Sequence, residues 1–167
     1  TLDGAGGGTG AAPLTLIDDV GLSLQEALPI LVDKLVEYRL RDRIRVIASG
    51  KLINPADVAW ALCVGADAVN NARGFMFSLG CIQAMQCNKN TCPTGITTHN
   101  QKLQRGLVPT DKATRVANYQ RNMIKELNTI AHSCGVKNAR YLSRRHARIV
   151  MSASTSISML DYYALNK

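Results

Sequence analysis

Three cysteines fall within twelve residues of the chain, in the pattern Cys81-x5-Cys87-x4-Cys92. Thiolates held close together bind soft metals, and sulfur ligands favour zinc and iron–sulfur clusters. The spacing matches neither common four-cysteine ferredoxin pattern. Three ligands suit a three-iron cluster, or a zinc ion if His99 or another group supplies a fourth ligand. Three unrelated buried thiols are the remaining alternative, which their crowding into so short a segment disfavours.

A second group of residues that suits chemistry lies in two short loops, Ser49-Gly50-Lys51 and Ala72-Arg73-Gly74. Small residues let backbone amides approach an anion, and a helix N-terminus adds a favourable dipole. Barrels of alternating strands and helices often bind phosphate with the loops after their last two strands. The two loops therefore indicate a phosphate site, although glycines occur at the turns of any strand–helix–strand unit.

A strand, a helix and a second strand must position these loops. Residues 43–48 read as a strand, and Pro55 opens a helix that Asn54 caps and Gly65 ends. Residues 67–70 read as the second strand. Such a unit implies a parallel sheet, in a doubly wound fold or a barrel, with ligands at the carboxyl ends of the strands.

Upstream of this unit the sequence predicts a loop and a helix. The glycine run from Gly4 to Gly10 cannot form the interior of a stable strand or helix. It predicts a loop whose backbone closely approaches a neighbouring group. Ser23 with Glu26 is a capping box that opens a helix. Pro29 is expected to interrupt or restart this helix, which continues to about residue 41.

The C-terminal third is basic and predicted to be helical. Residues 102–148 contain eleven Lys and Arg but only two acids, Asp111 and Glu126. We expect a helix over residues 111–134 and a basic helix over residues 138–151, followed by a Ser-rich tail. Such a surface attracts nucleic acid, anionic membranes or acidic partners, or is simply solvated. With two Phe and one Trp in the chain there is no aromatic stacking platform, and no nucleic-acid binding is predicted.

Composition narrows the class of protein. The chain has 167 residues, 46% of them hydrophobic and 19% charged, which suits one globular unit. No apolar run approaches the roughly 20 residues of a membrane span, and no signal peptide is evident, so a cytoplasmic location is expected. The odd number of cysteines, five, argues against a disulfide framework. Cys63 and Cys134 are expected to be core or free thiols.

Three linked motifs resemble those of one family. The cysteine spacing with Cys92-Pro93-Thr94-Gly95-Ile96-Thr97-Thr98 looks like the three-iron cluster loop of glutamate synthases. The segment Asp3 to Pro13 is similar to their glycine-rich loop, and Gly50 to Ala66 to the loop and helix before their last barrel strand. The motifs span about residues 3–100 in the family's order. The nearest resemblance is to stand-alone glutamate-synthase-like FMN proteins, which lack an amidotransferase domain.

This resemblance implies an α/β fold, the C-terminal part of a (β/α)8 TIM-type barrel with an iron–sulfur loop and trailing helices. Residues 1–100 would be the barrel portion, and residues 101–167 a basic helical extension packing on it. The segment would belong to an FMN- and 3Fe–4S-dependent oxidoreductase of glutamate biosynthesis that converts 2-oxoglutarate to glutamate by reductive amination. Its partners would be 2-oxoglutarate, an amino donor, an electron donor (NADPH or ferredoxin), and the missing barrel half or another chain.

The resemblance also assigns residues to roles. Cys81, Cys87 and Cys92 would ligate the cluster. Six residues at the two loops would hold the FMN phosphate: Ser49, Gly50, Lys51, Asn71, Ala72 and Arg73. Asp3, Gly7 and Gly8 of the glycine loop would lie near the flavin ring and the 2-oxoglutarate site.

The sequence also departs from the family pattern. Ser49 replaces an Asp, Lys51 is unusual beside the glycine, and Arg73-Gly74-Phe75 replaces a smaller segment. No acid, base or nucleophile of the chain is assigned a catalytic role, and enzyme activity would require the upstream barrel half. The alternative interpretation is a truncated, non-catalytic module that binds a metal or a partner without flavin.

Overall fold

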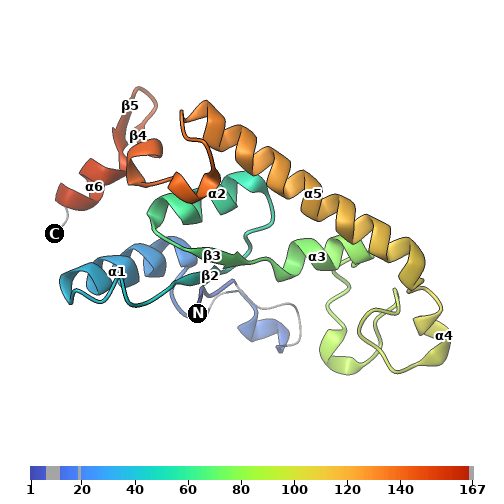
Figure 1. Ribbon diagram of the computed structural model, residues 1–167. Helices are drawn as coiled ribbons and strands as arrows, with labels where there is room; N and C mark the ends of the chain where they lie inside the picture. The colour runs from blue at the N-terminus through green and yellow to red at the C-terminus, as the bar shows by residue number, and fades with distance from the viewer. Residues whose placement is uncertain (7–11, 19, 166–167) are drawn as a thin grey trace.

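A parallel sheet lies at the centre of the N-terminal part of the structure (Figure 1). The computed structural model describes residues 1–6, 12–18 and 20–165. Within them, strands β1 (Leu2–Asp3), β2 (Ile47–Ser49) and β3 (Ala68–Asn70) pair in parallel in the order β1-β2-β3. The predicted parallel α/β arrangement is confirmed.

Two helices connect the three strands. Helix α1 (Leu24–Glu37) links β1 to β2, and α2 (Pro55–Val64) links β2 to β3. Both predicted caps are present: Ser23 and Glu26 form a capping box, and Asn54 accepts a hydrogen bond from the Asp57 amide. Strands that follow one another in order, each joined by a helix, form the repeating unit of a (β/α)8 barrel.

The prediction that Pro29 would interrupt the first helix is wrong, because α1 is continuous through it. Proline at this position removes one intrahelical hydrogen bond near the N-terminus. Its ring is buried on the same side as Leu28 and Val32, and this packing offsets the lost bond. The helix also ends earlier than predicted, at Glu37, and Arg39 just beyond it adopts a left-handed conformation (φ 57°).

The remaining elements follow β3. Helix α3 (Ala72–Leu79), which the sequence did not predict, leads into the cysteine segment. Then come a 3-10 turn η2 (Cys87–Lys89), α4 (Gln101–Gln104) and the long α5 (Pro109–Ser133). The chain closes with 3-10 turns η3 (Ala139–Tyr141) and η4 (Arg144–His146), the antiparallel strands β4 (Arg148–Ser152) and β5 (Thr155–Ser158), and α6 (Met159–Leu165). A further 3-10 turn, η1 (Leu14–Leu16), follows the glycine run.

The predicted basic helix over residues 138–151 is wrong. Asn138 Oδ1 accepts from the Arg140 amide, and the Ser143 amide donates to His146 Nδ1. Side chains that bond to nearby backbone in this way offer the chain an alternative to a helix. Beyond them, the β-branched pair Ile149-Val150 favours the hairpin strand.

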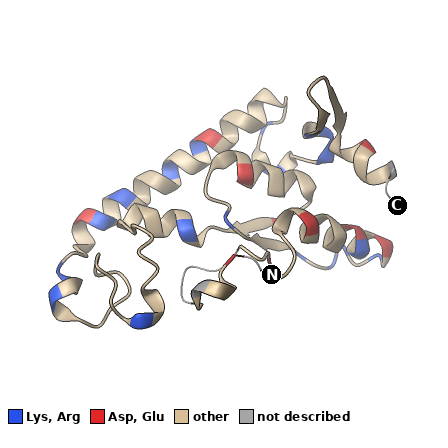
Figure 2. Ribbon diagram, turned by 180° about the vertical axis from the view of Figure 1, so that it is seen from behind, with Lys and Arg blue, Asp and Glu red and all other residues tan. Residues whose placement is uncertain are grey.

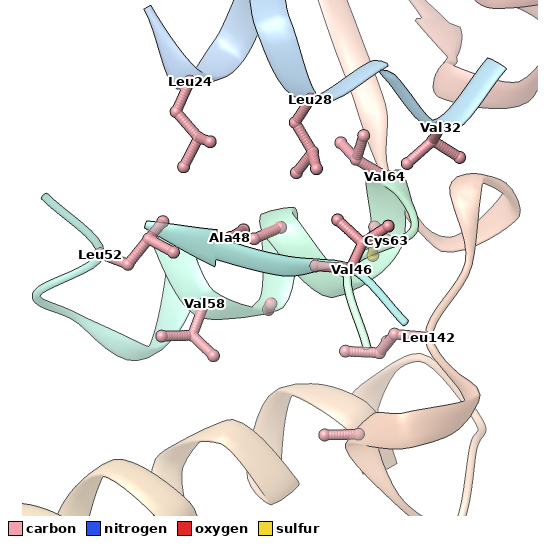
Figure 3. Close-up of a cluster of buried hydrophobic side chains, with 14 of the residues drawn as sticks. Leu24, Leu28, Val32, Val46, Ala48, Leu52, Val58, Cys63, Val64 and Leu142 are labelled. Atoms are coloured by element: carbon pink, nitrogen blue, oxygen red, sulfur yellow. The ribbon is translucent and has the colours of Figure 1, made fainter. Parts of the chain in front are cut away.

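The core lies between α1, α2 and the sheet (Figure 3). Leu28 of α1, Ala48 of β2 and Ala61 of α2 are 0% exposed. Helix α5 packs on α2 and α3 and adds Met123 and Leu127 to the same cluster, on the face that the sequence predicted.

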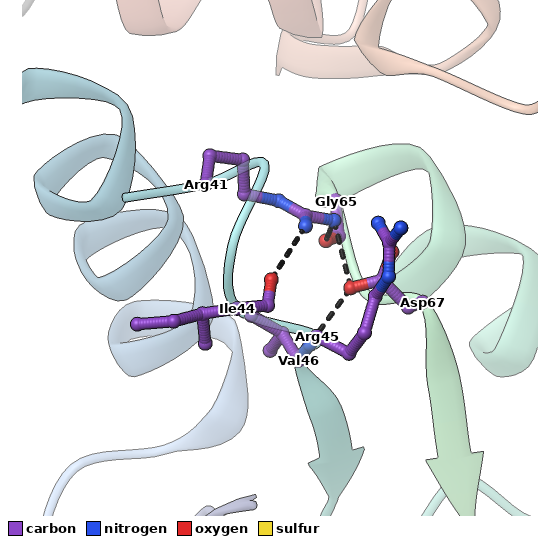
Figure 4. A network of polar contacts seen from close by, with 6 residues as sticks. All are labelled: Arg41, Ile44, Arg45, Val46, Gly65 and Asp67. Atoms are coloured by element: carbon purple, nitrogen blue, oxygen red, sulfur yellow. Dashed lines mark hydrogen bonds and ion pairs between the residues drawn. The ribbon is translucent and has the colours of Figure 1, made fainter. Parts of the chain in front are cut away.

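A polar network fixes the point where β2 begins (Figure 4). Asp67 Oδ2 accepts from the Val46 amide at 2.7 Å and pairs with Arg41 at 2.9 Å. The same guanidinium donates to the carbonyls of Ile44 and Gly65. Because the side chain of Asp67 takes the Val46 amide, strand pairing starts one residue later, at Ile47, and the predicted strand at 43–48 is displaced.

We expect Asp67→Asn to lower the free energy of unfolding by about 1–3 kcal/mol, because a partly buried charged hydrogen bond is lost. Burial opposes the charged carboxylate, but Arg41, the Val46 amide and Arg45 outweigh it and keep the pKa of Asp67 below its ordinary value. The stabilisation is therefore full above the ordinary pKa and is lost as pH falls through the lowered one. Urea unfolding at pH 7 and in acid measures both effects. Glu37→Gln, which breaks the exposed pair with Lys34, is the control, and equal losses in the two variants would contradict the prediction.

Candidate cofactor site

The residues at the ends of β2 and β3 meet in one narrow recess of about 10 Å³. All six residues that the sequence predicted to hold a phosphate line this recess: Ser49, Gly50, Lys51, Asn71, Ala72 and Arg73. Gly6, Leu52 and Asn70 complete the lining. Gly50 (φ +145°) and Lys51 (φ 53°) both take left-handed backbone conformations to form the turn. A left-handed lysine is sterically costly, and such residues concentrate at functional sites.

Asp3 lies at the same edge of the sheet. It pairs in register with Ser49, and the Gly4 amide donates to the Ser49 carbonyl at 2.9 Å. The structure therefore places Asp3 next to the strand-end recess. Gly7 and Gly8, which the sequence also nominated, lie outside the described residues.

Asn71, Ala72 and Arg73 do not form the simple loop that the sequence predicted. Asn71 caps α3, and its Oδ1 accepts from the Gly74 amide at 3.0 Å. Ala72 and Arg73 form the first turn of this helix. A helix N-terminus at this place adds a favourable dipole for an anion at the recess.

Tyr119 of α5 forms hydrogen bonds to the segments that follow both β2 and β3. Its hydroxyl donates to the Ile53 carbonyl at 2.5 Å and accepts from Asn71 Nδ2 at 2.6 Å. Its ring packs edge-on against Phe75, with 5.1 Å between centroids. The long helix thus holds the two strand ends in a fixed relation, which the sequence did not predict.

Asp18 is a further residue of the site that the sequence analysis missed. Its Oδ1 lies 2.8 Å from Lys51 Nζ and 3.8 Å from an Arg73 guanidinium nitrogen. The hydrogen bond from Lys51 is the main cause that holds the pKa of Asp18 below its ordinary value. The available signal was an acid eight residues after the glycine run, but nothing local connects it to residues 51 and 73.

All three clustered cysteines line a single pocket of about 210 Å³. Arg73 and Asp18 line the same pocket, so it adjoins the strand-end recess. Cys81 follows Gly80, which ends α3 in a left-handed conformation (φ +101°). Within the described residues, no three His, Cys, Asp or Glu side chains are arranged to hold a single metal ion.

The cysteine segment is held by polar contacts rather than by regular structure. Asn90 adopts a left-handed conformation (φ 60°); its carbonyl accepts from the buried Thr98 hydroxyl and its Oδ1 from the His99 amide. Gln104 of α4 donates to the Thr98 carbonyl at 2.8 Å. Gln83 and Met85 also have positive φ. Strained residues in a short stretch indicate a shape that the surrounding structure imposes.

Cys92 differs electrostatically from the buried Cys63. Burial raises the pKa of Cys92, but hydrogen bonds from Thr94 and Thr97 more than offset it and bring the pKa to about 6. Its sulfur lies 3.2 Å from Thr94 Oγ1. In Cys63 of α2, burial and the nearby Cys134 raise the pKa to about 11. Cys92 is therefore a thiolate at neutral pH, the form that ligates metals, and Cys63 a neutral core thiol.

Lys and Arg residues are spread along α5 and the cysteine end of the molecule, with few acidic residues among them (Figure 2). Lys102, Arg105, Arg115, Arg121 and Lys125 are exposed. In the described part of the chain, no helix combines the length and apolar character needed to cross a membrane.

Comparison with known proteins places these features in a family. The conserved region of glutamate synthase matches residues 1–137. The glutamate synthase large subunit-like protein YerD of Bacillus subtilis (strain 168) is 45% identical over 146 residues, which are 87% of this chain and 28% of that protein. The archaeal-type glutamate synthase (NADPH) of Dehalococcoides mccartyi is 33% identical over 166 residues, 98% of this chain and 33% of that protein.

A more distant relative is the glutamate synthase (NADPH) large chain of Azospirillum brasilense, 31% identical over 137 residues, which are 82% of this chain and 9% of that protein. The chain thus spans a third or less of the length of each of these three relatives. The family model nevertheless covers the sheet, both strand-end loops, the cysteine segment and α5. The chain belongs to the glutamate synthase family.

Proposed function

We propose that this chain forms the FMN-phosphate and iron–sulfur end of a glutamate-synthase-type (β/α)8 barrel that reductively aminates 2-oxoglutarate to glutamate. The observation that carries the proposal is the pocket that contains Cys81, Cys87 and Cys92 together with Arg73 of the strand-end recess. A redox cluster and a flavin must lie side by side to exchange electrons, and this chain sets their two candidate sites next to each other.

The donor set at the strand ends fits a phosphate. Lys51 and Arg73 supply two cations, and α3 directs its N-terminus to the same place. Backbone amides of Ser49 to Lys51 and of Asn71 to Arg73 would complete the anion site. Asp3, together with Gly7 and Gly8, would lie toward the flavin ring and the 2-oxoglutarate.

The cysteine pocket supplies the number and kind of ligands that a three-iron cluster needs. Three thiols on one pocket match the ligand number, and the pKa of about 6 at Cys92 makes one of them a thiolate before any metal binds. When bound, the flavin would supply hydride transfer and the cluster single-electron transfer. The protein's own part is to position both groups and to keep Arg73 between the thiols and the phosphate.

The complete reaction requires more than this chain. An amino donor and an electron donor (NADPH or ferredoxin) would be its partners, with the upstream barrel half or another chain closing the barrel. The relatives, at least three times as long as the segment that they share with this chain, leave room for that half.

Anaerobic purification of the 167-residue chain, followed by iron, sulfide and zinc analysis and a visible spectrum, tests the cluster. We expect bound iron and sulfide with broad visible absorbance, all lost in Cys87→Ser and retained in the control Cys134→Ser. Iron-free, colourless protein from both the wild-type chain and the control would overturn the cluster assignment.

A chimera tests the flavin and the reaction. In it, residues 1–137 of this chain replace the matching segment of the Bacillus subtilis relative, which supplies the remaining barrel. We expect the chimera to bind FMN and to form glutamate from 2-oxoglutarate. A folded chimera that binds iron but no flavin would instead support the metal-binding module without flavin.

A further inference from the structure

The carboxylate of Asp18 lies where the two cations of the strand-end recess converge. Asp18 Oδ1 is 2.8 Å from Lys51 Nζ and 3.8 Å from Arg73. The three side chains come from three separate segments: the one after η1, the turn after β2 and the first turn of α3. They share no local sequence relation, so their convergence is a property of the fold.

The recess is narrow while this contact is made. Its volume is about 10 Å³. The aliphatic part of Lys51 fills it from one side, because it lies against Gly6, where an added Cβ would be 3.0 Å from Lys51 Cε. The ion pair with Asp18 holds the Lys51 side chain in this position, so its ammonium group already faces a carboxylate.

Asp18 is free to release its partners at small structural cost. The side chains of Asp18 and Lys51 are 41% and 43% exposed, so water can solvate both when they separate. The segment that carries Asp18 is closed at its base by a hydrogen bond from the Ala5 amide to the Leu22 carbonyl, 2.8 Å long. Neither this hydrogen bond nor the one between Gly4 and Ser49 involves Asp18. Rotation of the Asp18 side chain therefore leaves the sheet intact.

We propose that Asp18 is an internal competitor for the anion site, occupying Lys51 and Arg73 in place of a phosphate and yielding them when a phosphate binds. This inference rests on the proposed phosphate site. Asp18 brings one negative charge to Lys51 and Arg73, whereas a phosphate monoester brings up to two negative charges and several acceptor oxygens. The phosphate therefore displaces the carboxylate, and Asp18 reduces the apparent affinity because the phosphate gains Lys51 and Arg73 only in molecules whose ion pairs with Asp18 are broken.

Removing the carboxylate should tighten phosphate binding. From the usual strength of exposed ion pairs, we expect Asp18→Asn to lower the dissociation constant for inorganic phosphate by roughly 1.5-fold to fivefold. Lys51→Met should weaken binding, and Asp18→Asn should gain less in that background, because its main partner is gone. Asp18→Ser, a second variant without the charge, should act in the same direction.

Isothermal titration of the 167-residue chain with inorganic phosphate, at constant ionic strength, measures these effects. Asp42→Asn is the matched control, since it removes an exposed carboxylate from the turn between α1 and β2. Unchanged or weaker binding in both Asp18 variants, with measurable wild-type binding, would overturn the inference and leave the phosphate site standing; Asp18 would then position Lys51. If no folded variant binds phosphate, the phosphate site of the proposed function and this inference both fail.

Discussion

Gly95→Ala is expected to destabilise the cysteine segment by about 2–4 kcal/mol, whereas Gly135→Ala should cost only about 1–2 kcal/mol. Both glycines have nearly the same left-handed backbone, with φ of +80° and +77°. The strain from the backbone alone is therefore similar. The space around the two positions is very different.

A Cβ at Gly95 would overlap the carbonyl oxygen of Leu103 and come within 3.0 Å of the Gln104 backbone. These atoms belong to backbone at α4 and cannot rotate away. At Gly135, which follows α5, nothing lies within 4 Å of an added Cβ. Gly95 thus lets the segment around Cys92 pack against α4, and a methyl group there separates the two.

Thermal unfolding and limited proteolysis of the two variants check this prediction. We expect a lower Tm for Gly95→Ala and new cleavage within residues 81–106, with neither change of similar size in Gly135→Ala. Equal effects in both variants would show that backbone strain, and not contact with α4, determines the cost.

The second large effect concerns the reactivity of Cys92. Its alkylation rate should rise with pH around a midpoint of about 6, because the thiolate is the reacting form. Thr94→Val removes the hydroxyl 3.2 Å from the sulfur and should move the midpoint toward the ordinary thiol range. Cys63, whose pKa is about 11, should stay unreactive throughout and serves as an internal control.

Peptide mass spectrometry after pulses of iodoacetamide across pH 5–9 gives the rate for each cysteine separately. Steric access could slow alkylation of the buried Cys92, but it would leave the midpoint unchanged, so the midpoint is the decisive readout. A wild-type midpoint near 9, equal to that of Thr94→Val, would refute the role of the Thr94 hydroxyl.

The Cys92 thiol also makes the free energy of unfolding depend on pH. The pKa of Cys92 is depressed on folding from 9.0 to about 6. The stability that the Cys92 thiolate gives to the folded state is therefore complete above pH 9 and is lost progressively as the pH falls to 6. Urea midpoints of the wild-type chain and of Cys92→Ser should converge toward pH 6.

Local signals in the sequence predicted much of the fold. The capping box at Ser23 and the cap at Asn54 set two helix starts, and Gly65 set a helix end, because each acts through residues within one turn. The strand-end residues come together because the carboxyl ends of neighbouring parallel strands share an edge. Where the chemistry is local, residue type and spacing are enough.

The remaining features depend on contacts that sequence distance hides. Tyr119 and Asn71 are 48 residues apart, and no pattern links them. Asp18 and Lys51 are 33 residues apart, and no local pattern in the sequence links this pair either. The predicted helix over residues 138–151 is absent because Asn138 and Ser143 form turn-forming bonds whose presence the sequence does not reveal.

The length of helix α5 restricts which insertions and deletions this family can accept during evolution. It has 25 residues and a length of about 37 Å, and it contacts α3 near one end and α2 near the other. Deleting or inserting one residue would rotate everything beyond it by about 100°. Tyr119 would then lose the strand ends, or Met123 and Leu127 would leave the core. Substitutions can accumulate on its exposed face, but its length is fixed, so the segment 109–133 should align among relatives without gaps.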